Sequence, residues 1–300
     1  MRDRRRWRRA AVAGAAIFVA LTTLFAWTGL SGAWRRPGYG ETGVSSLRDR
    51  PESLRVMAWN LEKGRRPEGE ATGSPDEMAG VLDRMAEVIR LSKVDVVLLA
   101  EVRMGCDACP LDQPVALAVA SGMHAWAYGV SYRWGLPFYK VQNGTAILSR
   151  YAFEVVEIET LPGARPLYLP ASNRRVLWVD LQLGDRTVRT APIWLESHEG
   201  DINLRQAEFL LDSLGPEGGL LGGDFNAQPD SDTIHRLRES GRLVGDFVGR
   251  DRTFPSWDPE RRIDFIFGPR AWRHRSTIVL EIGDLSDHRP VLTEFDLEDW

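Results

Sequence analysis

Cysteine is scarce in this sequence, which contains only Cys106 and Cys109. A four-ligand structural zinc site of the common type would need a second pair, and the chain has none. A redox-active pair would normally begin a helix after a strand, whereas Pro110 follows directly here in a predicted loop. Outside a membrane, a small local disulfide is the favoured interpretation, and two free thiols are the alternative.

Solenoid repeats are absent as well, and one long uncharged apolar run stands out, Ala10–Leu30. As a helix, its 21 residues would be about 30 Å long, which matches the hydrocarbon thickness of a bilayer. Residues 1–9 carry six arginines and one acid, which predicts a basic cytoplasmic tail. The sequence therefore predicts a single-pass transmembrane anchor over residues 10–30, with the remainder outside the cytoplasm. A cleaved signal peptide, and hence a secreted protein, is the alternative.

Excess positive charge is also lacking beyond the anchor. Residues 31–52 include a Gly-, Ser- and Pro-rich segment and are predicted to be a tether, which leaves residues 53–300 as one domain. Residues 1–36 hold eight arginines and one aspartate, so the exported part keeps 30 basic and 41 acidic residues, a formal net charge near −11. A nucleic-acid enzyme of this charge would depend on metal ions and a local basic patch.

Polar residues follow several apolar segments that are predicted to be strands. Asn60 follows VMAW, Glu101 follows VVLLA, His198 follows APIWLES and Asp224 follows LLGG. Strand ends at one edge of an α/β sheet are common places for functional sites. A single residue of this kind is more often a turn residue or a solvated loop residue. Four polar strand ends together indicate a functional site.

Two short strings near the end of the chain carry the chemistry, GDFN at 223–226 and SDHRP at 286–290. Asp224 and Asn226 are two residues apart, so on an extended segment both point to the same side. Asp287 and His288 are neighbours. Carboxylate and amide oxygens suit Mg²⁺ or Mn²⁺, and an adjacent histidine suits proton transfer or stabilisation of charge on phosphate. Together they predict metal-assisted hydrolysis of phosphoesters.

Seven segments in this order resemble the endonuclease/exonuclease/phosphatase superfamily, which includes deoxyribonuclease I, neutral sphingomyelinases and inositol-polyphosphate 5-phosphatases. They are WN at 59–60, LLAEV at 98–102, NGTAILSR at 143–150, SH at 197–198, GDFN at 223–226, RIDFIF at 262–267 and SDHRPV at 286–291. The resemblance implies an α/β fold, a four-layer sandwich of two mixed β-sheets flanked by helices, to which the N-terminal transmembrane helix is added.

The resemblance also implies roles for individual residues. Glu101 corresponds to the main divalent-metal ligand, with Asn60 and Asp287 as further metal ligands or ligand-positioning groups. The implied cofactor is Mg²⁺, with Mn²⁺ as an alternative.

Five further residues correspond to catalytic groups. Asp224 corresponds to the carboxylate that activates or orients the attacking water, and Asn226 to the amide that holds the scissile phosphate. His288 corresponds to the imidazole that stabilises or protonates a phosphoryl oxygen, and Asp264 to the acid paired with it. His198 corresponds to a second histidine found in the deoxyribonuclease, sphingomyelinase and 5-phosphatase branches.

Two other features leave alternatives open. Arg174 and Arg175 precede a predicted strand and either clamp a phosphate or are solvated. The aromatic-rich stretch 123–140 is interpreted as strand and loop packing, with a rim that meets lipid or stacks a base as the alternative.

The sequence thus predicts a membrane-anchored, exported, metal-dependent hydrolase of phosphodiesters, either nuclease-type or acting on small phosphodiesters. A phospholipid phosphodiesterase or an inositol-phosphate phosphatase is the alternative, and a catalytically inactive binding module of the same fold is the rival from another class. The expected partners are a phosphoester substrate and the membrane, bound through the N-terminal helix, and the protein is expected to be a monomer without an obligate protein partner.

Overall fold

The computed structural model describes residues 2–33, 37–64, 75–105, 111–136, 139–163, 174–198, 200–297 and 300. Cys106 and Cys109 lie outside these ranges, so the disulfide stays a prediction.

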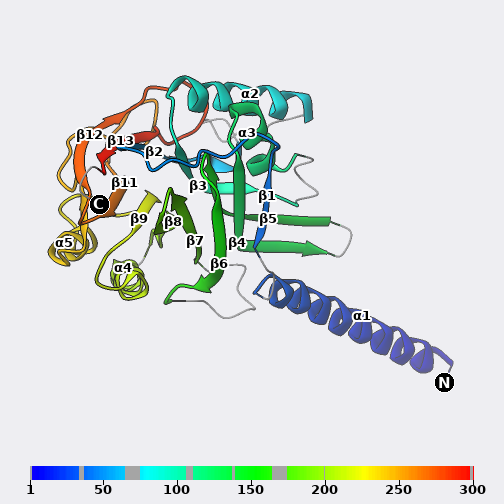
Figure 1. Cartoon of the computed structure of the whole chain (residues 1–300). Coiled ribbons are helices and arrows are strands. Elements are labelled where there is room, and N and C mark those ends of the chain that lie inside the picture. Colours follow the sequence, from blue (N-terminus) through cyan, green and yellow to red (C-terminus); the bar gives the residue numbers. More distant parts are fainter. Residues whose placement is uncertain are drawn as a thin grey trace.

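The N-terminal helix α1 projects away from the folded domain (Figure 1), although it contacts the strand over Ala125–Leu136. It runs over Arg2–Ala33 as one continuous helix, longer at both ends than the predicted anchor. Its window Trp7–Leu24 has a mean hydropathy of 1.2 and no buried part. By length and composition this helix can cross a membrane, and a signal sequence would meet the same criterion.

The predicted tether is wrong in part, because residues 38–41 form a strand of the folded domain. Strand β1 (Gly38–Glu41) pairs antiparallel with the first residues of β4 (Ala125–Leu136). A Cβ atom on Gly40 would lie 3.1 Å from the ring of Trp126. The glycine therefore allows the strand to pack closely over an aromatic ring. The sequence alone does not distinguish a glycine in a closely packed strand from a glycine in a flexible tether.

Two mixed sheets form the domain. The seven-stranded sheet has the order β1-β4-β5-β3-β2-β13-β12 and the six-stranded sheet has the order β10-β11-β9-β8-β7-β6. The remaining strands of the first sheet are β2 (Ser53–Asn60), β3 (Val96–Arg103), β5 (Tyr139–Ser149), β12 (Arg273–Val279) and β13 (Val291–Asp296). The strands of the second sheet are β6 (Phe153–Thr160), β7 (Arg175–Leu183), β8 (Arg186–Trp194), β9 (Leu220–Asp224), β10 (Leu243–Gly245) and β11 (Asp264–Pro269). The aromatic-rich stretch thus forms most of the β4–β5 hairpin.

Three apolar clusters separate four layers. The first lies between the seven-stranded sheet and the helices α2 (Pro75–Leu91) and α3 (Gln113–Ser121). The second fills the space between the two sheets. The third lies between the six-stranded sheet and the helices α4 (Gly200–Leu214) and α5 (Asp232–Glu239). The predicted four-layer sandwich is confirmed.

One parallel pair in each sheet brings functional residues to a common edge. Strand β2 is parallel to β3, and β8 is parallel to β9. The carboxyl ends of paired parallel strands lie at the same edge of a sheet. Each pair is continued on the outside by antiparallel strands, so both sheets are mixed.

Substitution of Gly223, one residue before the end of β9, would test the close pairing of β9 with β8. Its φ is +147°, and an added Cβ would lie 2.1 Å from the carbonyl oxygen of Ile193 on β8. We expect Gly223→Ala to lower the free energy of unfolding by about 2–4 kcal/mol, because strain and a backbone clash add. Gly80→Ala is the control, since a Cβ on this helical glycine would meet nothing within 4 Å. Urea unfolding in detergent micelles gives both values, and equal stability of the two variants would contradict the argument.

Candidate functional site

Asn60, the last residue of β2, joins the two sheets at the edge where the parallel strands have their carboxyl ends. Its Nδ2 atom donates to Asp224 Oδ2 on the second sheet at 3.0 Å and to Glu101 Oε1 at 3.4 Å. Glu101 has a φ of +53° within a register shift of β3. Such a bulge redirects a side chain, and a positive φ in a residue other than glycine is strained. Local backbone strain thus accompanies the position of Glu101.

Asp224 ends β9 and is almost completely buried. The backbone N–H of Asn226 donates to Asp224 Oδ1 at 2.9 Å. The Asn226 side chain donates to Asp224 Oδ2 at 3.2 Å and to the carbonyl oxygen of Leu195 at 3.0 Å. Asn226 has a φ of +49°, which is also a strained conformation. Asn226 therefore orients Asp224, and its amide must give up one of these bonds to reach a substrate.

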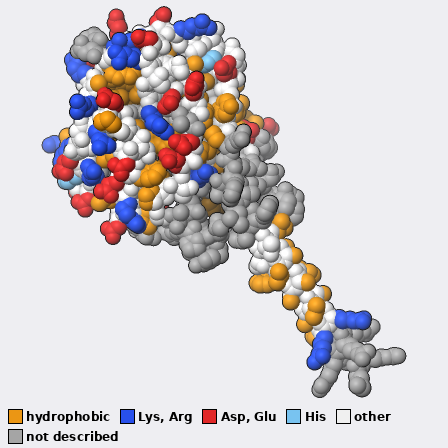
Figure 2. All heavy atoms as spheres, turned by 60° about the horizontal axis from the view of Figure 1, so that its bottom comes forward, with side chains coloured by type: hydrophobic (Ala, Val, Ile, Leu, Met, Phe, Trp, Pro, Cys, Tyr) orange, Lys and Arg blue, Asp and Glu red, His pale blue; other side chains and the backbone are white. Residues whose placement is uncertain are grey.

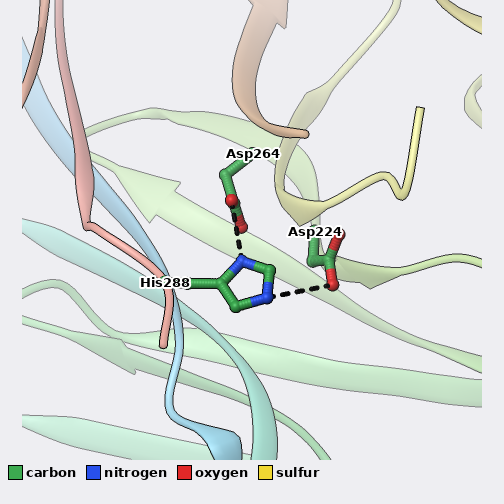
Figure 3. A group of neighbouring side chains, drawn as sticks. All are labelled: Asp224, Asp264 and His288. Atoms are coloured by element: carbon green, nitrogen blue, oxygen red, sulfur yellow. Dashed lines mark hydrogen bonds and ion pairs between the residues drawn. The ribbon is translucent and has the colours of Figure 1, made fainter. Parts of the chain in front are cut away.

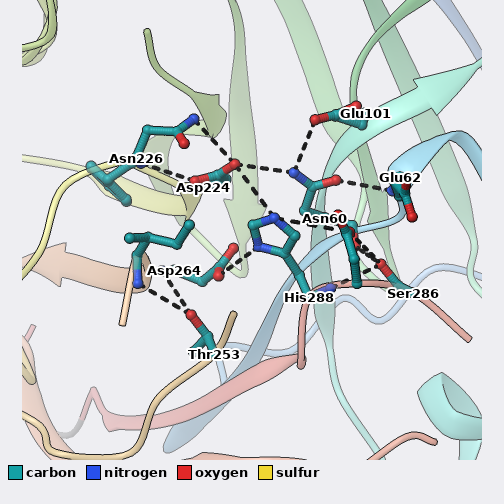
Figure 4. A network of polar contacts seen from close by, with 12 residues as sticks. Asn60, Glu62, Glu101, Asp224, Asn226, Thr253, Asp264, Ser286 and His288 are labelled. Carbon is teal, nitrogen blue, oxygen red and sulfur yellow. Dashed lines mark hydrogen bonds and ion pairs between the residues drawn. The ribbon is translucent and has the colours of Figure 1, made fainter. Parts of the chain in front are cut away.

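His288 lies between two carboxylates (Figure 3). Its Nδ1 atom donates to Asp264 Oδ2 at 2.9 Å, and its Nε2 atom is 4.0 Å from Asp224 Oδ2. Asp264, which is fully buried, begins β11 directly opposite Asp224 in the antiparallel pairing. The Ser286 hydroxyl accepts from the backbone N–H of His288 and donates to the carbonyl oxygen of Asn60. Ser286 therefore fixes the histidine loop to the end of β2 (Figure 4).

The pKa values of the buried pair follow from this geometry. Burial acts to lower the pKa of His288, but Asp264, Asp224 and Asp287 outweigh it and raise this pKa to about 10. Burial raises the pKa of Asp224 to about 7, although the charge of His288 opposes the shift. Asp224, Asp264 and His288 lie close enough to hold a metal ion. A charged imidazole in this position is held by the hydrogen bond to Asp264 and by an ion pair with Asp224.

The three predicted metal ligands, Asn60, Glu101 and Asp287, are oxygen donors that suit a hard divalent cation. Burial raises the pKa of Asp287, and the nearby Glu101 carboxylate adds to the shift. Burial acts to raise the pKa of Glu101 too, but Lys63 and the hydrogen bond from Asn60 bring it below the ordinary value. Lys63 forms an ion pair with Glu101 Oε2. The carboxylates thus attract positive charge, and the donor set fits a divalent cation that would compete with Lys63.

Arg174 is a neighbour of the site. Its side chain is buried, and its guanidinium carbon lies 3.6 Å from the ring centroid of Trp194. Burial lowers its pKa, while Asp224 and Glu101 act to raise it. The Nε and Nη1 atoms have no hydrogen-bond partner within the described part of the chain. This arginine is not a solvated surface residue, and it offers unused donors beside two site carboxylates. Arg175 instead donates to the carbonyl oxygen of Val130.

His198 is the predicted site residue that the structure does not bring into this network. It is exposed in the loop that follows β8, at the same edge of the second sheet as Asp224. Its backbone N–H donates to Glu196 Oε1 at 3.2 Å. Within the described ranges its side chain has no polar contact with the other seven residues. Lys63 and Ser286 are not among the predicted site residues, and for Arg174 the sequence left a phosphate clamp and a solvated residue as alternatives. Ser286 is the first residue of the SDHRP segment, and this position is the only feature of the sequence that could have indicated its role.

Comparisons with known proteins show the family and the fold. The model of the Endonuclease/Exonuclease/phosphatase family matches residues 57–288. An endonuclease/exonuclease/phosphatase of Beutenbergia cavernae is similar, with 23% identity, a TM-score of 0.61 and coverage of 82% of this chain and 72% of that one. The catalytic domain of human Nocturnin with a bound sulfate anion has 17% identity, a TM-score of 0.57 and coverage of 88% and 97%. A mannosyl-6-phosphatase of Bacteroides thetaiotaomicron has 16% identity, a TM-score of 0.58 and coverage of 81% and 99%.

No protein with curated annotation matches the sequence. The structural neighbours, all below 25% identity, share the fold, and the family model covers more than half of the chain. The chain therefore belongs to the endonuclease/exonuclease/phosphatase family.

Proposed function

We propose that this protein is a membrane-anchored, exported hydrolase of phosphate esters that depends on a divalent metal ion. The observation that carries the proposal is the continuous chain from Asp264 through His288 to Asp224, which Asn60 connects to Glu101. It places a protonated imidazole, a carboxylate with a raised pKa and a set of oxygen donors at one edge of the two sheets. Attack of water on phosphate needs these three kinds of group.

Each side chain has a proposed task. Asp224 accepts the proton of the attacking water, for which a pKa near 7 is suitable. His288 donates from Nε2 to a phosphoryl oxygen or to the leaving oxygen, and Asp264 keeps the imidazole oriented and charged. Asn226 orients Asp224. His198, which is exposed, is proposed to add a donor once substrate is bound.

Asn60, Glu101 and Asp287 are the residues proposed to hold the metal ion. A bound Mg²⁺ or Mn²⁺ supplies positive charge that polarises the phosphate ester and stabilises the charge developing in the transition state. Arg174 lies within electrostatic reach of Glu101, and its unused donors suit a phosphate oxygen.

A phosphodiester is the favoured substrate class, as the sequence predicts. The formal charge near −11 beyond the anchor disfavours tight, non-specific binding of nucleic acid. One structural neighbour is named a mannosyl-6-phosphatase and another holds a bound sulfate anion, and these two support a phosphomonoester as the second candidate. A catalytically inactive binding module is less well supported, because the proposed catalytic and metal-binding residues are all present.

The test is hydrolysis of bis(p-nitrophenyl) phosphate and p-nitrophenyl phosphate by the full-length protein in detergent micelles. We expect cleavage to fall at least about 10²-fold in a chelator and to return with Mg²⁺ or Mn²⁺, because charge stabilisation by the metal is lost and restored. Asp224→Asn, purified in parallel, controls for contaminating hydrolases. Full activity in chelator, or equal activity of the Asp224→Asn protein, would refute the proposal.

A further inference from the structure

The link between α1 and the folded domain is short. Helix α1 ends at Ala33 and β1 begins at Gly38, so their Cα atoms are at most about 18 Å apart. A free tether over residues 31–52 could instead extend to about 75 Å. Because β1 is bonded into the sheet, an anchor in the membrane holds the edge of the domain that carries β1 close to the bilayer surface.

The strand pairing shows where this attachment lies relative to the site. Gly38 is paired with Tyr128 on β4, and Tyr128 with Ala146 on β5. Ala146 is paired with Leu99 on β3, and Leu99 with Trp59 on β2. This row of paired residues ends at Trp59, one residue before Asn60. It passes through Leu99, two residues before Glu101. Three strand spacings separate β1 from β3, which is about 14 Å. The anchor therefore joins the domain about 15 Å from Glu101 and about 20 Å from Asn60, two of the proposed metal ligands.

The direction of the strands places the attachment at the same edge as the site. Strand β1 is antiparallel to β4, β4 to β5, and β5 to β3. The amino end of β1 therefore lies at the edge where β2 and β3 have their carboxyl ends, with Asn60 and Glu101. Helix α1 also contacts β4. The chain thus leaves α1 and enters the domain at its active-site edge.

The surface next to the attachment suits a membrane interface. Tyr39, one residue into β1, is 66% exposed although it is a large aromatic residue. Tyrosine is enriched where a protein meets the headgroup layer, because its ring is apolar and its hydroxyl is polar. Figure 2 shows apolar side chains along the described length of α1 and arginines near its free end, so the helix has the charge distribution of an anchor.

We infer that the active-site edge faces the bilayer and that the substrates are phosphate esters of membrane lipids, hydrolysed at the membrane surface. This inference rests on the proposed function and narrows its substrate class. A site held next to its own anchor meets headgroup phosphates at high effective concentration, whereas a large soluble polymer has to enter between the domain and the membrane.

The experiment changes the length of the link while the site stays intact. Full-length protein is placed in phosphatidylcholine vesicles that contain sphingomyelin, phosphatidylinositol or phosphatidylglycerol as minor lipids. Release of headgroups is followed by mass spectrometry, and bis(p-nitrophenyl) phosphate is the soluble reporter in the same samples. One variant carries four EAAAK repeats between Arg36 and Pro37, a semi-rigid spacer of about 30 Å. The control carries the same insert between Gly215 and Pro216, in the turn before β9, at the opposite end of that strand from the site.

We expect the spacer after Arg36 to lower lipid hydrolysis at least about 10-fold, while hydrolysis of the soluble ester changes less than about two-fold. The insert at Gly215 should leave both rates near those of the unmodified protein. Lipid hydrolysis that is insensitive to the spacer would overturn the inference. Cleavage of the soluble ester without cleavage of any of the lipids would also overturn it and leave the proposed function standing. If neither is hydrolysed with Mg²⁺ present, the proposed function itself fails. Plasmid DNA that is cut faster by the spacer variant would identify a soluble polymer as the substrate.

Discussion

Replacing His288 with alanine is expected to lower kcat by about 10²–10³-fold with little change in KM, because the imidazole acts on charge that develops in the transition state. Asp264→Asn should cost less, about 10-fold, since it removes the charge that orients and polarises the histidine but keeps the shape of the side chain. The two residues share the 2.9 Å hydrogen bond at Nδ1. The double variant should therefore lose hardly more than His288→Ala alone.

Steady-state kinetics on bis(p-nitrophenyl) phosphate measure this double-mutant cycle, with circular dichroism as the check on folding. His274→Ala is the matched control, because this histidine lies on β12 and contacts Thr277. If the losses of activation free energy in the two single variants add up in the double variant, Asp264 acts independently of His288. Asp264 would then be better explained as a metal ligand, and the proposed pairing of Asp264 with His288 would be wrong.

Glu101→Gln is expected to raise the Mg²⁺ concentration needed for half-maximal activity by about 10²-fold or more. A neutral amide removes one negative charge from the oxygen donors, and even supporting residues around metal sites typically cost 10–100-fold in affinity. The substitution also removes the ion pair with Lys63. At limiting Mg²⁺ the variant should be almost inactive, and saturating Mg²⁺ should recover a large part of the rate.

Binding of Mn²⁺, followed by electron paramagnetic resonance, gives a measure that does not depend on turnover. Glu157→Gln is the control, because Glu157 lies on β6 and pairs with Arg189 at the surface. An unchanged Mn²⁺ affinity in Glu101→Gln would exclude Glu101 as a ligand and require another metal position.

Local patterns were sufficient to predict most of the strands that lead to the site edge, whereas the four layers were predicted from the family resemblance. The apolar runs before Asn60, Glu101 and Asp224 are strands β2, β3 and β9. Their polar ends meet because two parallel pairs of strands have their carboxyl ends at the same edge of the sandwich. This information is local, since an apolar run and the residue that ends it are neighbours in the sequence.

The parts that the sequence did not predict depend on contacts between distant segments. Lys63 reaches Glu101 from a turn in which its own φ is +64°. Arg174, just before β7, is buried because the ring of Trp194, at the end of the neighbouring strand β8, covers it. Strand β1 forms because β4 offers a free edge. Periodicity and residue type contain no information about which surfaces come together, so a buried arginine and a solvated one have the same local pattern.

The pairing of β13 with β2 joins the last strand of the sandwich to the first of the two strands that hold the proposed metal ligands. The loop that carries His288 leads directly into β13. A chain that is synthesised from its amino end therefore has an unpaired edge of β2 until Val291–Asp296 have been made, and it lacks His288 until shortly before that point. Under the proposed function, we therefore expect a nascent chain to be inert toward phosphate esters until the His288 loop and β13 have been synthesised.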